Sequence, residues 1–152
     1  MIKIVATNRK GRRDYQIIET YEAGVELKGN EVKSLRTQGC TLNDSFARIE
    51  REELFLYNAH IPEFEKSSFF RTEPKRTRKL LVHKKEIKKL ESLTTQRGLT
   101  LIPTKVYFNQ QGRVKVEIAL ARGRHTFDKR KKLKDDISER ETQRALKNFR
   151  KR

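Results

Sequence analysis

Three histidines and two neighbouring aspartates are the side chains of this sequence that could carry catalysis or hold a metal ion. His60, His83 and His125 stand far apart along the chain, and no two have the spacing typical of zinc ligands or of an acid–base pair on one element. Asp135 and Asp136 lie within a basic run, where local charge balance explains them. We expect no metal site here, and a ribonuclease using His60 or His83 remains the enzymatic alternative.

The remaining reactive positions carry no enzymatic signature. Cys40 is the only cysteine, so the sequence predicts neither an internal disulfide framework nor a cysteine-based zinc site. Glycine-rich phosphate loops of the GxGxxG or GxxxxGK[ST] kind do not occur. We therefore predict a protein that is not an enzyme and needs no cofactor.

Positive charge is the strongest feature of the composition. Lys and Arg number 37 against 20 Asp and Glu, which gives a formal net charge of +17. Such an excess repels itself in a compact chain and favours a polyanionic partner. Nucleic acid is the first candidate, because neutralised phosphates release counterions, and an acidic membrane surface is the second. The charge gathers in an N-terminal arm (residues 1–13), in a predicted helix (29–39) and in a C-terminal tail (122–152).

The elements that must carry these charges follow from hydrophobic period and turn residues. Alternation predicts strands over residues 15–27, 44–49, 53–59, 79–82, 99–108 and 113–121. Three- and four-residue spacing predicts helices over 29–39 and 83–96, with Asn30 capping the first and Gly39 ending it. Residues 60–75 contain two prolines and no period, so they are expected to form a long loop.

This pattern predicts a mainly β fold: a small antiparallel OB-like barrel of about six strands with flanking short helices. We expect the barrel to span residues 1–121. Residues 122–152 contain 13 Lys and Arg against 5 Asp and Glu, with few large apolar side chains. Such a segment is predicted to be a basic tail that is disordered alone and becomes helical against a partner.

The expected location is the cytoplasm. Lys3 interrupts the opening apolar residues too early for a signal peptide. Apolar runs also fall well short of the roughly 20 residues that span a bilayer, so no membrane partner is expected.

Several motifs closely resemble the small protein B family, the SsrA-binding proteins that partner transfer-messenger RNA in bacterial trans-translation. The longest runs from Tyr21 to Arg36 and contains EAG-x-x-L-x-G-x-EVKSLR. Further matches are Asn8-Arg9-Lys10, Asp44-Ser45, Asn58-Ala59-His60-Ile61, Thr77-Arg78-Lys79-Leu80-Leu81 and the segment Gly123 to Arg130. The resemblance covers essentially the whole chain, in order.

The resemblance implies an OB-like barrel that binds the tRNA-like domain of transfer-messenger RNA and delivers it, with elongation factor Tu and GTP, to a stalled ribosome. It implies that the tail occupies the empty decoding region and mRNA channel of the small subunit. Asn8, Lys10, Glu22 and Lys115 match positions that the family uses against the tRNA-like domain. Lys33 and Arg36 are expected to contribute, and Arg9 completes the predicted RNA-binding set. Asp128, Lys129 and Arg130 match the decoding-site motif of the tail.

Two points remain open at this stage. Phe127 stands where the family often has a polar aromatic residue, so it can stack on a base but cannot donate a hydrogen bond through its ring. The alternative function is a generic OB-fold protein that binds single-stranded RNA. It would bind unstructured oligonucleotides as tightly as folded RNA.

Overall fold

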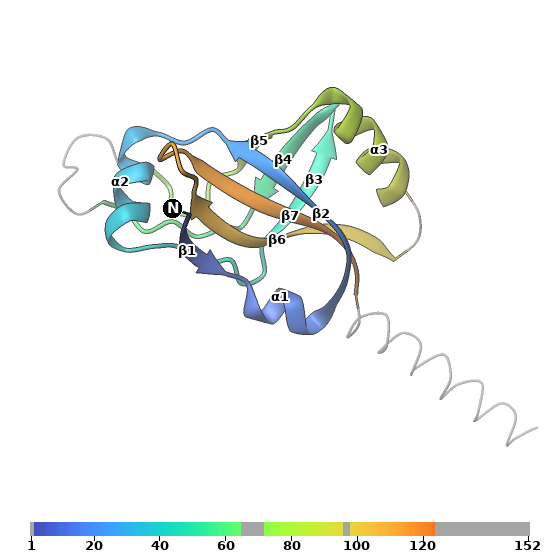
Figure 1. The fold of residues 1–152 in the computed structure, drawn as a ribbon, viewed down its shortest axis with the longest axis horizontal. Helices are drawn as coiled ribbons and strands as arrows, with labels where there is room; N and C mark the ends of the chain where they lie inside the picture. Colours follow the sequence, from blue (N-terminus) through green and yellow to red (C-terminus); the bar gives the residue numbers. More distant parts are fainter. Residues whose placement is uncertain (1, 65–71, 96–97, 124–152) are drawn as a thin grey trace, which may run out of the picture.

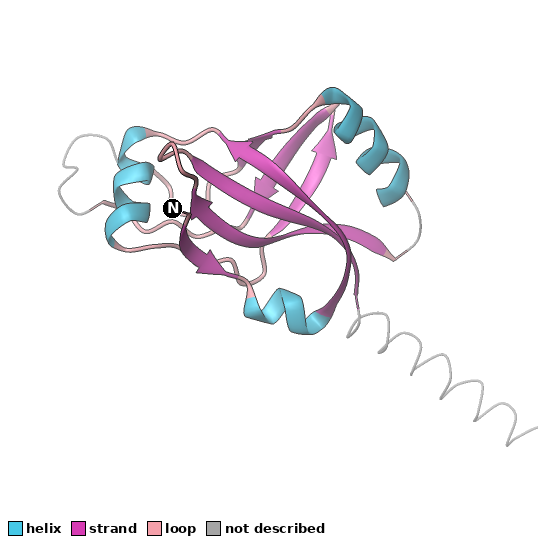
Figure 2. Ribbon diagram, in the orientation of Figure 1, coloured by secondary structure: helices cyan, strands magenta, loops and turns pink. Residues whose placement is uncertain are grey.

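The computed structural model describes residues 2–64, 72–95 and 98–123. Seven strands and three helices occur within these ranges (Figures 1 and 2). In chain order they are β1 (Lys3–Thr7), α1 (Arg9–Asp14), β2 (Tyr15–Val25), α2 (Gly29–Thr37), β3 (Phe46–Glu50), β4 (Glu53–Tyr57), β5 (Arg78–Leu81), α3 (Lys84–Thr94), β6 (Leu99–Phe108) and β7 (Val114–Gly123).

Six of these strands close into a ring in the order β6-β3-β4-β5-β2-β7, with β7 pairing back to β6. Every pairing is antiparallel. The long strands β2, β6 and β7 form the most extended part of the ring, and β1 adds a further strand to β6. The predicted OB-like barrel with flanking short helices is confirmed.

The core fills the inside of the ring because alternate residues of each strand point inward. Ile118, Leu120 and Val116 of β7 are buried with Leu54 of β4 and Leu101 of β6. Burying a side chain of this size contributes about 1.5–3 kcal/mol relative to leaving it in water. From α3, Leu90 enters the same cluster and closes one end of the barrel.

The N-terminal residues are not the simple basic arm that the sequence predicted. Residues 3–7 pair with β6 as β1, and residues 9–14 form α1. Val5 and Ala6 pack against the barrel core, which gives this short segment its apolar anchor. This apolar stretch is short and lies between cations, so the hydrophobic period did not predict a strand here.

The start of α2 also differs from the sequence prediction. Lys28 holds the N-cap position, and its backbone amide donates to the Glu31 side chain at 2.9 Å. Asn30 instead donates to the Thr72 hydroxyl at 2.9 Å, so its side chain joins α2 to a distant loop. The helix ends as predicted near Gly39, which adopts φ +77, a left-handed conformation that glycine accepts without strain.

Candidate nucleic-acid interface

The strands β1, β6, β7 and β2 lie side by side and share one outward surface (Figure 1). Their inward neighbours fill the core, so the alternating positions must point outward. Register places Ile4, Tyr107, Lys115 and Gly24 in one row across the four strands, and Thr7, Lys105, Glu117 and Glu22 in the next. We call the side chains of these two rows the outer face.

Glu22 and Lys115, both predicted to bind RNA, therefore lie on the same surface. Glu22 is exposed on β2, and Lys115 is half-buried on β7. The Tyr107 hydroxyl donates to Glu22 Oε2 from β6, two strands away. Tyr107 was not predicted as a site residue, because its contact with Glu22 depends on the register of three strands.

Glu117 of the outer face lies close to two cations. Its carboxylate lies 3.8 Å from Arg12 Nη2 and 3.9 Å from Lys105 Nζ, and it accepts from the Thr104 hydroxyl. Lys105 also lies 5.5 Å from the centroid of the Tyr107 ring, within cation–π distance. The outer face thus places two carboxylates among several cations, with α1 at its border.

Asn8 is the N-cap of α1 rather than an exposed contact. Its Oδ1 accepts from the Gly11 amide at 2.8 Å, and its Nδ2 donates to the Pro103 carbonyl at 2.8 Å. The residue is only 2% exposed. The expectation that this amide meets a base or a sugar edge disagrees with the geometry, because both ends of the amide are already bonded inside the protein.

The cations of α1 that follow this cap are exposed. Arg9 and Lys10 begin the helix, and Lys10 Nζ pairs with Asp44 Oδ1 at 2.7 Å. The hydrogen bond with Asp44 raises the pKa of Lys10 and lowers that of Asp44. Exposed pairs of this kind are weak, so Lys10 can exchange Asp44 for another anion at low cost.

The predicted cations of α2 form a separate group. Lys33 and Arg36 are exposed on the helix, 6.0 Å from the Phe64 ring and 5.7 Å from the Phe108 ring respectively. Figure 1 places α2 at one end of the barrel and α1 along its side. The structure therefore divides the predicted RNA-binding residues between two surfaces.

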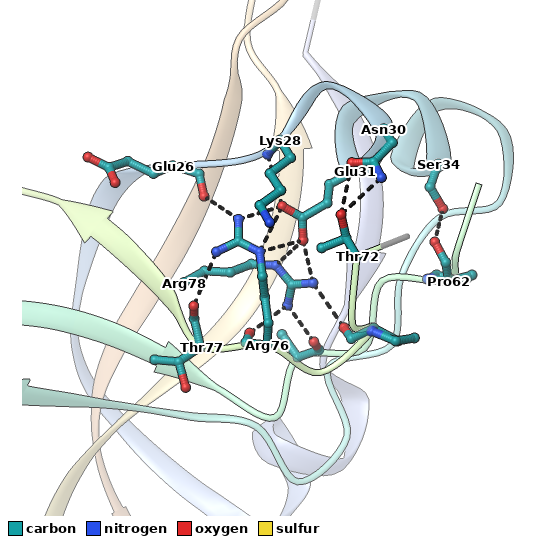
Figure 3. Close-up of polar contacts among 12 residues, drawn as sticks. Glu26, Lys28, Asn30, Glu31, Ser34, Pro62, Thr72, Arg76, Thr77 and Arg78 are labelled. Carbon is teal, nitrogen blue, oxygen red and sulfur yellow. Dashed lines mark hydrogen bonds and ion pairs between the residues drawn. The ribbon is translucent and has the colours of Figure 1, made fainter. Parts of the chain in front are cut away.

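A buried ion cluster fixes α2 to the barrel (Figure 3). Glu31 is 3% exposed and accepts from Arg78 Nε at 2.7 Å and from Arg76 Nε at 3.2 Å. Arg78 is 1% exposed and also donates to the carbonyls of Ala59 and Pro74 at 2.7 and 2.9 Å. The motif EVKSLR marked this region, but the sequence alone did not reveal that its glutamate is buried.

The other residues that were considered for catalysis or metal binding have ordinary structural roles. The backbone of His60 pairs with Thr41, and His83 is the N-cap residue of α3. No group of three or more His, Cys, Asp or Glu side chains that could hold a metal ion occurs in the described ranges. Burial raises the pKa of the Cys40 thiol to about 11, so the thiol is protonated at neutral pH. No described helix combines the length and apolarity needed to cross a membrane.

The predicted tail lies mostly outside the described residues, together with its site residues Asp128, Lys129 and Arg130. The part that is described belongs to the barrel. Arg122 and Gly123 are the last residues of β7 and pair with Gln16 and Tyr15 of β2. The last strand therefore continues two residues beyond the predicted boundary at residue 121.

A small closed barrel with cations along one sheet face and on flanking helices defines an OB-like RNA-binding protein. A family model described as "SmpB protein" matches residues 5–148. The chain belongs to the SmpB family. It is similar to SsrA-binding proteins of Thermosipho melanesiensis (51% identity; 97% of this chain and 98% of the relative) and Pseudothermotoga lettingae (50%; 97% of both).

A solved structure gives the same assignment. It is described as "tmRNA-SmpB: a journey to the center of the bacterial ribosome", and its chain is 50% identical to this one with a TM-score of 0.68. The match covers 80% of this chain and 84% of that one. Fold and sequence therefore point to the same family across most of the barrel.

Proposed function

We propose that this protein binds the tRNA-like domain of transfer-messenger RNA and delivers it to stalled ribosomes for rescue and peptide tagging. The observation that carries the proposal is a match to SsrA-binding proteins at about 50% sequence identity over nearly the whole chain. The outer face supplies a surface of suitable chemistry. Its role is to bind and place RNA, without catalysis.

The outer face suits a folded RNA better than a flexible strand. Lys105 and Lys115 stand on a rigid sheet, with Arg12 at its border, and cations held in fixed positions favour a partner whose phosphates are also held in place. Glu22 adds a requirement that phosphates cannot meet, since a carboxylate needs a hydrogen-bond donor. We propose that Arg9, Lys10, Lys33 and Arg36 add further phosphate contacts, and that Asn8 acts through the position of α1.

The tail completes the proposal. We propose that Asp128, Lys129 and Arg130 bind the empty decoding region of the small subunit, and that the tail follows the mRNA channel. Elongation factor Tu with GTP would bring the protein–RNA pair to the ribosome, which places the protein in the cytoplasm. The basic composition of residues 124–152 supports contact with ribosomal RNA.

A binding titration tests the RNA half of this proposal. The dissociation constant would be measured for a tRNA-like RNA and for an unstructured RNA of equal length, each at two salt concentrations. We expect preference for the folded RNA at both, with affinity falling as salt rises. Equal affinity for the two RNAs would favour the generic single-strand binder instead.

A further inference from the structure

Tyr107 is a buried member of the outer face, yet its hydroxyl reaches an exposed carboxylate. The residue is 5% exposed, and its register partners are Ile4 on β1 and Lys115 on β7. From this position the side chain reaches diagonally across β7, and its hydroxyl donates to Glu22 Oε2. Packing fixes the ring, so the hydroxyl offers a rigid hydrogen bond to a side chain that would otherwise rotate freely.

Glu22 stands in an unfavourable electrostatic position. Its register partner on β7 is another carboxylate, Glu117, and like charges directly opposite each other destabilise a sheet. Glu117 has Arg12 and Lys105 within 4 Å. Glu22 forms no ion pair with any residue of the described ranges, and its hydrogen-bond partner there is the neutral Tyr107 hydroxyl.

Two other tyrosine–glutamate pairs on the barrel surface differ in this respect. Tyr57 donates to Glu50 at 2.7 Å, and Arg48 lies 3.9 Å from the same carboxylate oxygen. Tyr21 donates to Glu19 at 2.6 Å, and Lys89 pairs with that carboxylate at 3.3 Å. Both of those carboxylates have a cation within the protein, whereas the Glu22 carboxylate has a tyrosine and no cation among the described residues.

The Tyr107 hydroxyl is a stable donor. Burial, followed by the hydrogen bond to Glu22, raises its pKa above the ordinary tyrosine value. It therefore stays protonated across the physiological range and occupies one oxygen of the carboxylate. The second oxygen, Oε1, remains as an acceptor on an exposed surface.

We propose that Tyr107 is a positioning residue of the RNA interface, and that it holds Glu22 so that Oε1 accepts a hydrogen bond from the RNA. The donor is a base amino group or a ribose 2′-hydroxyl, because a phosphate has no hydrogen to donate at neutral pH. This inference rests on the proposed function and names the chemistry of one of its contacts. The cations of the outer face hold the RNA, and the Glu22–Tyr107 pair makes binding depend on which group lies opposite.

A double-mutant cycle tests the proposal. Tyr107→Phe keeps the ring and removes only the hydroxyl. We expect it to weaken binding of the tRNA-like RNA about three- to tenfold, the range of the net contribution of a typical hydrogen bond. Adding Tyr107→Phe to Glu22→Ala should weaken binding no further, since the hydroxyl then has nothing to position. The dependence of affinity on salt should stay that of the wild-type protein, because no phosphate contact is lost.

Tyr57→Phe is the matched control, since it also removes a hydroxyl that donates to a glutamate, outside the outer face. It should bind RNA like the wild type. Thermal unfolding of each variant separates loss of fold from loss of contact. The inference is overturned if Tyr107→Phe binds normally, or if its effect multiplies fully with that of Glu22→Ala.

The choice of RNA identifies the donor group and also tests the proposed function separately from this inference. If the Tyr107→Phe effect persists on a tRNA-like RNA with 2′-deoxyribose at the contacted positions, the donor is a base amino group. If it disappears there, the donor is a ribose hydroxyl. A wild-type protein that does not prefer the tRNA-like RNA would instead refute the proposed function itself.

Discussion

Glu22 is exposed and contributes little to the packing of the barrel, so its replacement isolates an RNA contact from folding. Glu22→Ala should weaken binding of the tRNA-like RNA by at least about tenfold, because a hydrogen bond to a charged group contributes roughly 1.5–3 kcal/mol. Stability should change by no more than about 0.5 kcal/mol, as for most surface substitutions. RNA titration and thermal unfolding of the same sample measure the two effects.

Glu53→Ala serves as the control for this variant. Glu53 also lies on a strand and pairs with a half-buried lysine, Lys79, at 3.5 Å, but on another part of the ring. Its loss should leave RNA affinity unchanged. If both variants weakened binding equally, loss of any negative charge would explain the result and Glu22 would not be a specific contact.

Glu31 is the opposite case, a buried carboxylate whose role is stability. Removing the charge with Glu31→Gln leaves the buried Arg78 guanidinium without its counterion. Breaking one partner of a buried pair typically costs about 3–5 kcal/mol, so we expect a large fall in melting temperature. Glu26→Gln, an exposed change on the same segment, should leave the melting temperature near that of the wild type.

The pH dependence of this contribution has a definite sign. Burial, the largest influence, raises the pKa of Glu31, but hydrogen bonds from Arg76 and the Lys28 amide and the charge of Arg78 together bring it below the ordinary value. A lowered folded-state pKa stabilises the fold above the ordinary glutamate value near 4.3 and loses that effect as the pH falls further. Melting temperatures of wild type and Glu31→Gln should therefore begin to converge as the pH falls below that ordinary value. A constant difference there would contradict the assignment.

At the scale of elements, α1 depends on a single cap. Asn8→Ala removes both the acceptor for the Gly11 amide and the donor to Pro103, and should destabilise the protein by about 1 kcal/mol. Gly11→Ala should act on the same contact from the other side, because its added Cβ would lie 2.5 Å from Asn8 Nδ2. Thermal unfolding measures this loss of stability.

The Asn8 cap is also expected to affect RNA binding, because it holds α1 in position. If α1 presents Arg9 and Lys10 to the RNA, both Asn8→Ala and Gly11→Ala should weaken binding without changing either cation. Arg9→Ala provides the comparison, since it removes a cation while leaving the cap intact. Normal RNA affinity in both cap variants would mean that the position of α1 does not matter for binding.

Local pattern was enough to predict most elements but not the partners of individual side chains. The β6–β7 hairpin was predictable because Val114, Val116, Ile118 and Leu120 alternate strictly and Gly112 follows the turn. β1 was missed because Val5 and Ala6 give too short an apolar signal between cations. The cap at Asn30 was wrong because Thr72, far along the chain, offers its side chain a tertiary partner.

The site shows the same division. Glu22 and Lys115 were predicted through the resemblance, and register places both on the outer face. Tyr107 could not be predicted, since an irregularity between Pro103 and Lys105 sets which residues of β6 lie beside β7. A one-residue slip there would turn the hydroxyl toward the core.

At the scale of the whole molecule, the barrel and the basic C-terminal segment should separate by function. A chain cut after Gly123 keeps every strand that the structure describes and should retain most of its affinity for the tRNA-like RNA, while losing peptide tagging on stalled ribosomes. RNA titration and a tagging assay on the same protein measure the two. Tagging by the shortened chain would refute the role assigned to Asp128, Lys129 and Arg130.

A cut after Ala121 provides the comparison for this boundary. It removes Arg122 and Gly123, which pair with Gln16 and Tyr15 at the start of β2. We expect a lower melting temperature than for the cut after Gly123, because ladder hydrogen bonds and their packing are lost. Equal melting temperatures would place the functional end of the barrel at residue 121, as the sequence alone suggested.

The closure of the ring by the last strand affects how the protein is made. Glu22 and Tyr107 are 85 residues apart, and β2 gains its β7 neighbour only when synthesis has passed Gly123. Until then the nascent chain exposes the edges of β2 and β6, which invite pairing with other chains. The surface through which this protein would serve stalled ribosomes thus cannot form on a copy whose own translation stops early.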